Sequence, residues 1–126
     1  MALSRYTVKR TAQWESQLGL SHAVGANGLL FVSGVTGLES DLRDIESQSR
    51  GAFLSLSESL AEAGARLAHL VELTTYHVDL RQNMEKFIEV KAAFIQHPYP
   101  AWTALGVTEL ISPEALVEIR AIATLS

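Results

Sequence analysis

The sequence contains no cysteine among its 126 residues. This absence excludes disulfide bonds, thiolate metal sites and a cysteine nucleophile, and it agrees with a cytosolic location. The chain also lacks an apolar run long enough to cross a bilayer, and residues 1–6 lack the basic region and apolar core of a signal peptide. We therefore expect a soluble, cytoplasmic protein with no membrane partner.

Clustered positive charge is absent too. The 10 lysine and arginine residues are scattered singly apart from Lys9-Arg10, and the formal net charge is -4. Because nucleic-acid-binding proteins neutralise phosphates with basic patches, we expect no nucleic-acid partner. The histidines do not stand at ligand spacing, so we expect no metal site. They are His22, His69, His77 and His97.

The residues that are present have the composition of an ordinary folded protein, 48% hydrophobic and 19% charged. The length suits a single domain over residues 1–126. Asn27-Gly28 is typical of a tight hairpin turn. The apolar run at 29–34 predicts a strand buried on both faces, and 13–19 is interpreted as a loop. Alternating or apolar runs predict strands over 6–10, 21–24, 29–34, 71–80, 101–107 and 116–125.

Two segments have helical periodicity, from Ile45 to Ala63 and from Met84 to Phe94. Small polar residues precede each segment, and glycine or proline follows it. The expected caps and stops are Asp41 or Asp44 and Gly64 for the first helix, and Asn83, Pro98 and Pro100 for the second.

The resulting order, β-β-β-α-β-α-β-β, predicts an α/β (α+β) fold. Each helix has apolar residues on one side only, and both must bury that side against the sheet. We therefore expect a mixed sheet with two helices on one face. The opposite sheet face carries many apolar side chains that a domain of this size cannot cover alone. We therefore expect self-association through that face.

Glu118 is a carboxylate inside an otherwise apolar strand. Burial would raise its pKa toward the range useful for proton transfer. Arg120 lies two residues along the strand and so on the same face, where pairing would keep Glu118 ionised. The sequence leaves both alternatives open, and a third is a glutamate satisfied by backbone donors.

Four blocks of the chain stand out, namely Ser21-His22-Ala23-Val24; Leu30-Phe31-Val32-Ser33-Gly34; Ala61 to Ala65 with Val71 to Leu80; and Pro100-Ala101-Xaa-Thr103 with Leu116 to Ala123. In this order and at this spacing, the blocks resemble the RidA/YjgF family of reactive intermediate deaminases, also called L-PSP endoribonuclease-like proteins.

The resemblance implies a chorismate-mutase-like fold and a homotrimer whose sheets line a central barrel, with a ligand cleft at each subunit interface. It also implies hydrolysis of enamines and imines to ketones and ammonia without a metal or organic cofactor. The typical cleft holds an arginine that clamps the substrate carboxylate, a glutamate that positions or activates water, and a tyrosine.

These roles transfer only in part. The glutamate falls on Glu118 and the serine of the Ser-Gly pair falls on Ser33. Trp102 stands at the position of the arginine, and Leu20 at that of the tyrosine. An indole cannot replace a guanidinium fork, so the resemblance implies a divergent member that is a poor deaminase of carboxylate-bearing substrates. We expect a neutral or aromatic ligand, or a cation lying over the indole face.

Several residues keep two interpretations. Trp102 suits a ligand platform or a filler of the trimer interface. Ser33 is more typical of a hydrogen-bonding residue at a strand end than of a nucleophile. Backbone groups near Gly34 or Ala104 could hold the reacting nitrogen or oxygen. His22 stands next to the expected cleft as a proton-transfer candidate or as a polar strand residue.

The leading hypothesis is therefore hydrolytic deamination of a small imine or enamine. A non-catalytic, ligand-binding or regulatory trimer is the alternative. Ribonuclease activity or translation inhibition, which the older family name suggests, is the weakest because the chain is acidic and has no basic aromatic strip.

Overall fold

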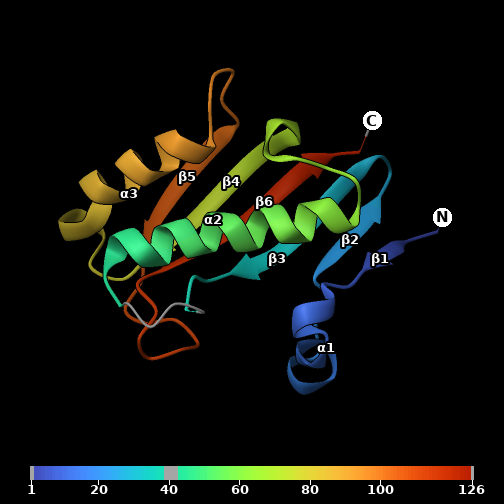
Figure 1. Ribbon diagram of the computed structural model, residues 1–126, viewed down its shortest axis with the longest axis horizontal. Coiled ribbons are helices and arrows are strands. Elements are labelled where there is room, and N and C mark those ends of the chain that lie inside the picture. The colour runs from blue at the N-terminus through green and yellow to red at the C-terminus, as the bar shows by residue number, and fades with distance from the viewer. Residues whose placement is uncertain (1, 39–42, 126) are drawn as a thin grey trace.

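The computed structural model describes residues 2–38 and 43–125 as a layer of helices on a twisted sheet (Figure 1). The strands are β1 (Ser4–Tyr6), β2 (Ala23–Ala26), β3 (Leu29–Val35), β4 (Leu70–His77), β5 (Ala101–Gly106) and β6 (Val117–Thr124), and the α-helices are α1 (Gln13–Leu18), α2 (Ile45–Glu62) and α3 (Leu80–Phe94). Short 3-10 turns cover Lys9–Thr11 and Leu67–His69. No helix in the described ranges is both long and apolar enough to cross a membrane.

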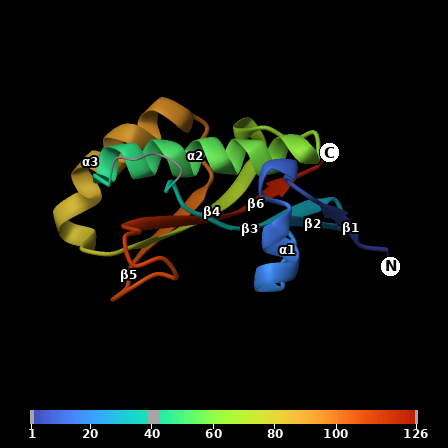
Figure 2. The same cartoon turned by 60° about the horizontal axis from the view of Figure 1, so that its bottom comes forward.

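The sheet is mixed, as the sequence predicts. Its strand order is β1-β2-β3-β6-β4-β5. Neighbouring strands run antiparallel except β4 and β5, which are parallel because α3 connects them. Helices α2 and α3 cover one face of the sheet (Figure 2). This confirms the predicted α+β architecture and leaves the other face, here called the open face, without a helix layer.

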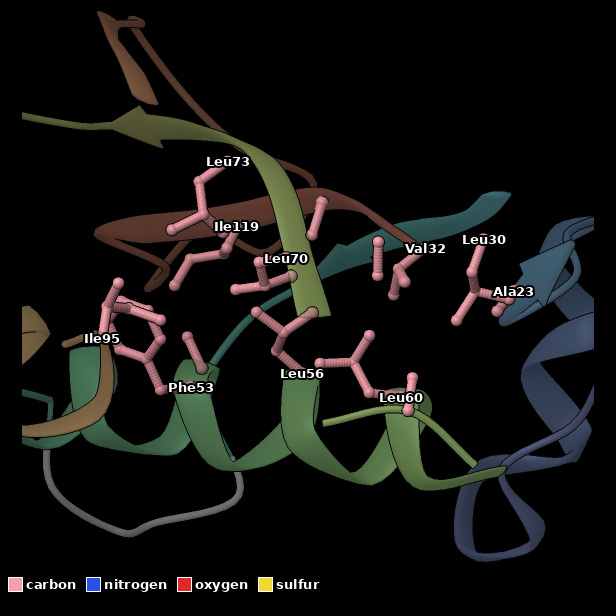
Figure 3. Close-up of a cluster of buried hydrophobic side chains, with 14 of the residues drawn as sticks. Ala23, Leu30, Val32, Phe53, Leu56, Leu60, Leu70, Leu73, Ile95 and Ile119 are labelled. Carbon is pink, nitrogen blue, oxygen red and sulfur yellow. The ribbon is translucent and has the colours of Figure 1, made fainter. Parts of the chain in front are cut away.

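The hydrophobic core lies between α2 and the sheet (Figure 3). Strand β6 sends alternate residues into it, because side chains two apart point to the same face. Helix α2 contributes Phe53, Leu56 and Leu60, all fully buried. Each such side chain contributes about 1.5–3 kcal/mol relative to its exposed state. The buried residues of β6 are Val117, Ile119, Ala121 and Ala123.

The predicted burial of the 29–34 strand on both faces is wrong. Leu30 and Val32 are buried under the helix layer, whereas Phe31, which lies between them on the open face, is 41% exposed. A continuous apolar run cannot reveal that only one sheet face has a helix layer. The open face also carries Leu105, which is 45% exposed.

The N-cap of helix α2 is Asp44, one of the two residues predicted for that position. The Asp44 carboxylate accepts a hydrogen bond from the backbone N–H of Ser47 at 2.7 Å. The other candidate cap, Asp41, lies outside the described residues. Gly64, just beyond the helix, has a φ of 75°, which glycine adopts without strain.

The predicted cap of α3 is wrong. Asn83 lies inside the first turn of the helix, where its side-chain amide donates to the carbonyl of Val78 at 3.3 Å. The N-cap position is occupied by Asp79, whose φ of 56° turns the chain directly from β4 into α3. Aspartate is among the few residues that tolerate this left-handed region. The helix ends at Phe94, ahead of Pro98 and Pro100.

Two N-terminal predictions are also wrong. The strand expected over 6–10 lies at Ser4–Tyr6, and the loop expected over 13–19 contains helix α1. A helix of 6 residues is too short to show a periodic apolar face. Its end is nevertheless marked by Gly19, which has a φ of 69°.

Candidate functional site

Glu118 lies on β6 with its side chain on the open face, opposite Tyr76 of β4. Beside it, the pairing of β3 with β6 shifts register between Val32 and Val35, which is a β-bulge. Gly34 lies in this bulge, and a Cβ at that position would overlap the Glu118 carboxylate. The close approach therefore depends on glycine at position 34.

The Glu118 carboxylate is half-buried and unpaired. Within the described ranges, no hydrogen bond or ion pair reaches it. Burial raises the pKa of Glu118 above its usual value of 4.5. Arg120 is exposed on the same strand and forms no ion pair with Glu118. Of the alternatives that the sequence leaves open, desolvation therefore outweighs pairing in this chain.

Ser33 uses its hydroxyl to join two segments. It donates to the carbonyl of Ser21 at 2.5 Å, and its backbone N–H donates to the carbonyl of His22 at 3.0 Å. The side chain thereby ties β3 to the segment before β2. This arrangement agrees with the hydrogen-bonding interpretation of Ser33 and leaves the hydroxyl proton committed.

His22 belongs to a separate polar cluster around α1. It is buried, with Nε2 2.9 Å from the Thr11 hydroxyl and Nδ1 3.2 Å from a carboxylate oxygen of Glu15. Its ring stacks on Trp14 at 6.2 Å between centroids. The cavity beside this cluster holds only about 20 Å³, enough for one water. His22 therefore ties α1 to the sheet.

Trp102 lies on the sheet face that α2 and α3 cover. Its strand neighbour Leu73 is fully buried in the core, and the indole packs on Phe87 of α3 at 6.0 Å between centroids. The indole N–H donates to the hydroxyl of Thr75 at 2.9 Å. Ala104 points to the same face, because it lies two residues further along β5.

The structure thus divides the residues singled out from the sequence into two sets. Glu118 and Arg120 lie on the open face with the Ser33–Gly34 bulge, whereas Trp102 and Ala104 lie on the helix-covered face. Within one protomer these sets are not brought together. Strand alternation determines which residues of one strand share a face. Whether a given residue of β5 lies on the same face as a given residue of β6 depends on how both strands pair with β4.

Lys91 is the neighbour of Trp102 that sequence reasoning missed. Its Nζ lies over the indole at 4.4 Å from the ring centroid and 5.8 Å from the ring of Tyr99. Burial lowers the pKa of Lys91 below its usual value. The signal was present, because Lys91 lies four residues after Phe87 and so on the apolar stripe of α3.

A groove of about 490 Å³ opens beside Lys91 and Trp102, between α3 and the segment that leads into β5. Its walls include Ile88, Ile95 and Tyr99. Its size is within the range of small-molecule sites. Among the described residues, no group of three or more histidine, aspartate or glutamate side chains is placed to hold a metal ion.

The sequence profile of the family "Endoribonuclease L-PSP" matches residues 11–125. The chain belongs to this family, the RidA/YjgF group. The RutC family protein YjgH of Escherichia coli K12 is 39% identical over 94 residues, which are 71% of this chain and 72% of that protein.

Two further relatives place the chain within the family. The Reactive Intermediate Deaminase A, chloroplastic, of Arabidopsis thaliana is 32% identical over 110 residues, 83% of this chain and 58% of that protein. The crystal structure of Rv2704 from Mycobacterium tuberculosis, a YjgF/YER057c/UK114 family member, superposes with a TM-score of 0.86 at 32% identity, covering 98% of this chain and 99% of that one. The predicted fold is therefore confirmed as the fold of this family.

Proposed function

We propose that this protein hydrolyses a small imine or enamine to a carbonyl compound and ammonia, with Glu118 as the group that moves the proton. The observation that carries the proposal is the half-buried Glu118 carboxylate, which has no hydrogen-bond or ion-pair partner within the described residues and whose pKa is raised by burial. A raised pKa brings a carboxylate closer to the value at which it both accepts and returns a proton near neutral pH. The name of the Arabidopsis relative, a reactive intermediate deaminase, supports the same class of reaction.

In this mechanism Glu118 accepts a proton from water while the water oxygen attacks the imine carbon, and it returns that proton to the nitrogen to give a carbinolamine. Glu118 then accepts the proton of the carbinolamine hydroxyl and passes it to the amine nitrogen as the carbon–nitrogen bond breaks and the carbonyl forms. One imine and one water give one ketone or aldehyde and one ammonia, so no oxidant or cofactor enters the balance. Gly34 supports the proposal because it leaves room at the carboxylate.

The proposed substrate is not held by the arginine typical of the family, because Trp102 occupies that position in the Pro-Ala-Xaa-Thr run. We further propose that the active assembly is a homotrimer formed through the open face. Exposed apolar residues such as Phe31 and Leu105 on that face support this assembly. A second subunit would also shield Glu118 and its reacting water from bulk solvent.

Ribonuclease activity has less support, although the family description carries the word. Several basic side chains are paired with carboxylates, and the basic residues are spread over several elements rather than forming a strip that follows a phosphate backbone. These pairs include Arg10 with Glu58, Arg50 with Glu46, and Lys86 with Glu89.

The test is ammonia release from freshly generated imines, with and without a carboxylate, by the wild type and by Glu118→Gln. Glutamine keeps the size of the side chain and removes its proton affinity. Loss of a general acid–base group costs about 10²–10⁴-fold in rate, so turnover should fall by at least about 100-fold.

The matched control is Glu72→Gln, which changes an exposed glutamate on β4 of the same sheet and should leave turnover within about twofold of wild type. If Glu118→Gln releases ammonia as fast as the wild type, the proposed mechanism is wrong.

A further inference from the structure

A second polar side chain without a partner lies beside Glu118 on the open face. Tyr76 of β4 is paired directly with Glu118 of β6 in the antiparallel register, so the two side chains project from the same face of the sheet as neighbours. Both are partly buried. Within residues 2–38 and 43–125 the Tyr76 hydroxyl forms no hydrogen bond, and it does not donate to the Glu118 carboxylate. The phenol O–H is therefore available to a ligand.

We propose that Tyr76 is the second functional residue of the Glu118 site, and that its phenol donates a hydrogen bond to the nitrogen of the imine while Glu118 moves the protons. The inference rests on the proposed function, because it assigns a partner to Glu118 in that reaction. The hydrogen bond itself can nevertheless be measured without turnover.

The two side chains are chemically complementary. An ionised carboxylate only accepts hydrogen bonds, whereas a phenol also donates one. Hydrolysis of an imine needs both functions, because the attacking water must lose a proton and the nitrogen must receive electron density from the opening double bond. A donor held against the nitrogen stabilises the charge that develops there and makes the adjoining carbon more electrophilic.

The step balances with Tyr76 unchanged. As the water oxygen adds to the carbon, the electrons of the carbon–nitrogen π bond become a second lone pair on the nitrogen. That pair takes the proton returned by Glu118, while the phenol keeps its own proton and its hydrogen bond to the first lone pair. Tyr76 thus stabilises the nitrogen as the carbinolamine forms and transfers no proton.

A row of residues across the open face limits the space around the pair. Leu105 of β5 is paired with Tyr76 on the side away from Glu118, and it is 45% exposed. On the far side of Glu118, Gly34 has no side chain and leaves the bulge of β3 open at the carboxylate. The carbon skeleton of a small, uncharged imine can therefore lie against Leu105 with its reacting atoms between the phenol and the carboxylate.

The kinetic test is Tyr76→Phe, which removes only the hydroxyl. We expect kcat for ammonia release to fall by at least about 10-fold, because the hydrogen bond strengthens as charge develops on the nitrogen. For the same reason KM should change by less than about threefold. The matched control is Tyr6→Phe on β1, which β2 and β3 separate from β6, and it should leave kcat within about twofold of wild type. An unchanged kcat in Tyr76→Phe would overturn the inference.

A second test needs no turnover. Cyclohexanone represents the carbonyl product and presents one acceptor, whereas methylenecyclohexane has the same shape and no acceptor. A hydrogen-bond donor lowers the stretching frequency of a bound carbonyl, so infrared difference spectra should show a lower frequency for cyclohexanone in the wild type than in Tyr76→Phe. Chemical-shift titration should show cyclohexanone binding about 3–10-fold more weakly to Tyr76→Phe, and methylenecyclohexane binding equally to both proteins.

The outcomes distinguish failure of this inference from failure of the proposed function. If the wild type releases no ammonia but binds cyclohexanone with a shift in carbonyl frequency that depends on Tyr76, the proposed reaction is wrong and the donor role of Tyr76 is supported. Glu118→Gln should retain that shift. If the wild type does not bind cyclohexanone, or if the carbonyl frequency is the same in Tyr76→Phe, the inference is wrong while the role of Glu118 stands. A changed sedimenting mass in Tyr76→Phe without a change in carbonyl frequency would assign the phenol to a subunit contact and would also overturn the inference.

Discussion

At the level of single residues, a series of buried polar side chains lies beneath the groove between α3 and β5. The Thr75 hydroxyl accepts the Trp102 indole N–H and lies 2.7 Å from Nε2 of His77. His77 is fully buried, and its ring packs edge-on against the ring of Phe87 with 4.6 Å between the two ring centroids. Its Nδ1 has no hydrogen-bond partner among the described residues. Such an arrangement disfavours the charged imidazolium, and burial lowers the pKa of His77 to about 4.

This depressed pKa predicts a pH dependence of stability. The pKa of His77 is 6.5 in the absence of burial and about 4 in the folded protein, so the unfolded chain binds more protons between these values. The unfolding free energy should therefore be fully retained above pH 6.5 and fall as the pH decreases toward 4, by up to about 3 kcal/mol from this residue.

Denaturant unfolding of the wild type and of His77→Leu at several pH values in this range measures the effect. The difference between the two proteins in how the unfolding free energy changes with pH isolates the contribution of His77 from that of the carboxylates. NMR titration of the His77 ring gives an independent check. A midpoint near 6.5 in the folded protein would contradict the prediction.

At the scale of elements, α2 is attached to the rest of the fold by main-chain contacts as well as by its apolar face. The Gln48 side chain donates to the carbonyl of Glu114 at 2.9 Å and accepts from the N–H of Leu116 at 2.7 Å, which ties α2 to the entrance of β6. Gly37 and Gly51 meet backbone to backbone, which allows the chain leaving β3 to pass directly against the helix.

This contact predicts that Gly37→Ala is strongly destabilising. A Cβ on residue 37 would overlap the carbonyl oxygen of Gln48 and lie 2.8 Å from the backbone nitrogen of Ala52, and neither helical atom can move freely. We expect a loss of about 3 kcal/mol in the unfolding free energy, as for a severe case of overpacking.

Chemical denaturation measures this loss. The matched control is Gly25→Ala, where the nearest atoms to a new Cβ are side-chain atoms at 3.4 Å and the expected change is below about 1 kcal/mol. Equal effects at positions 25 and 37 would show that the backbone contact with α2 is unimportant.

At the scale of the whole molecule, the sheet is covered on one side only. The open face places Phe31 beside Ile122 across the β3–β6 pairing, with the Glu118 carboxylate further along β6. An apolar sheet face of this kind is typical of a subunit interface. Assembly through it would bury Glu118 further and would raise its pKa more than in the isolated protomer.

We therefore predict that Phe31→Lys converts a trimer into monomers. Burying an unpaired charge in an apolar interface costs several kcal/mol. This cost exceeds the stabilisation that any single apolar contact of the interface contributes. Sedimentation equilibrium measures the mass directly. Leu54→Lys is the control, because Leu54 is 62% exposed on α2, in the helix layer that covers the other face of the sheet. A wild-type monomer, or an unchanged mass in Phe31→Lys, would contradict the assembly proposed here.

Local signals were sufficient to predict most elements. The cap at Asp44, the glycine stop at Gly64 and the alternation of β6 act within one or two turns or along one strand, so residue type reports them directly. Local signals did not predict the conformation where contacts with another element of the fold set it. Helix α1 is too short for periodicity, and the positive φ of Asp79 is imposed by the tight passage from β4 into α3.

The element order, the apolar side of each helix, the family and the presence of a carboxylate in an apolar strand all follow from the residues. Which of the candidate residues meet depends on the tertiary structure. Pairing of both β5 and β6 with β4 puts Trp102 on the opposite sheet face from Glu118, and the packing of α3 brings Lys91 over the indole. The physical reason is that strand register and helix docking depend on contacts between residues far apart in the chain, which no local pattern encodes.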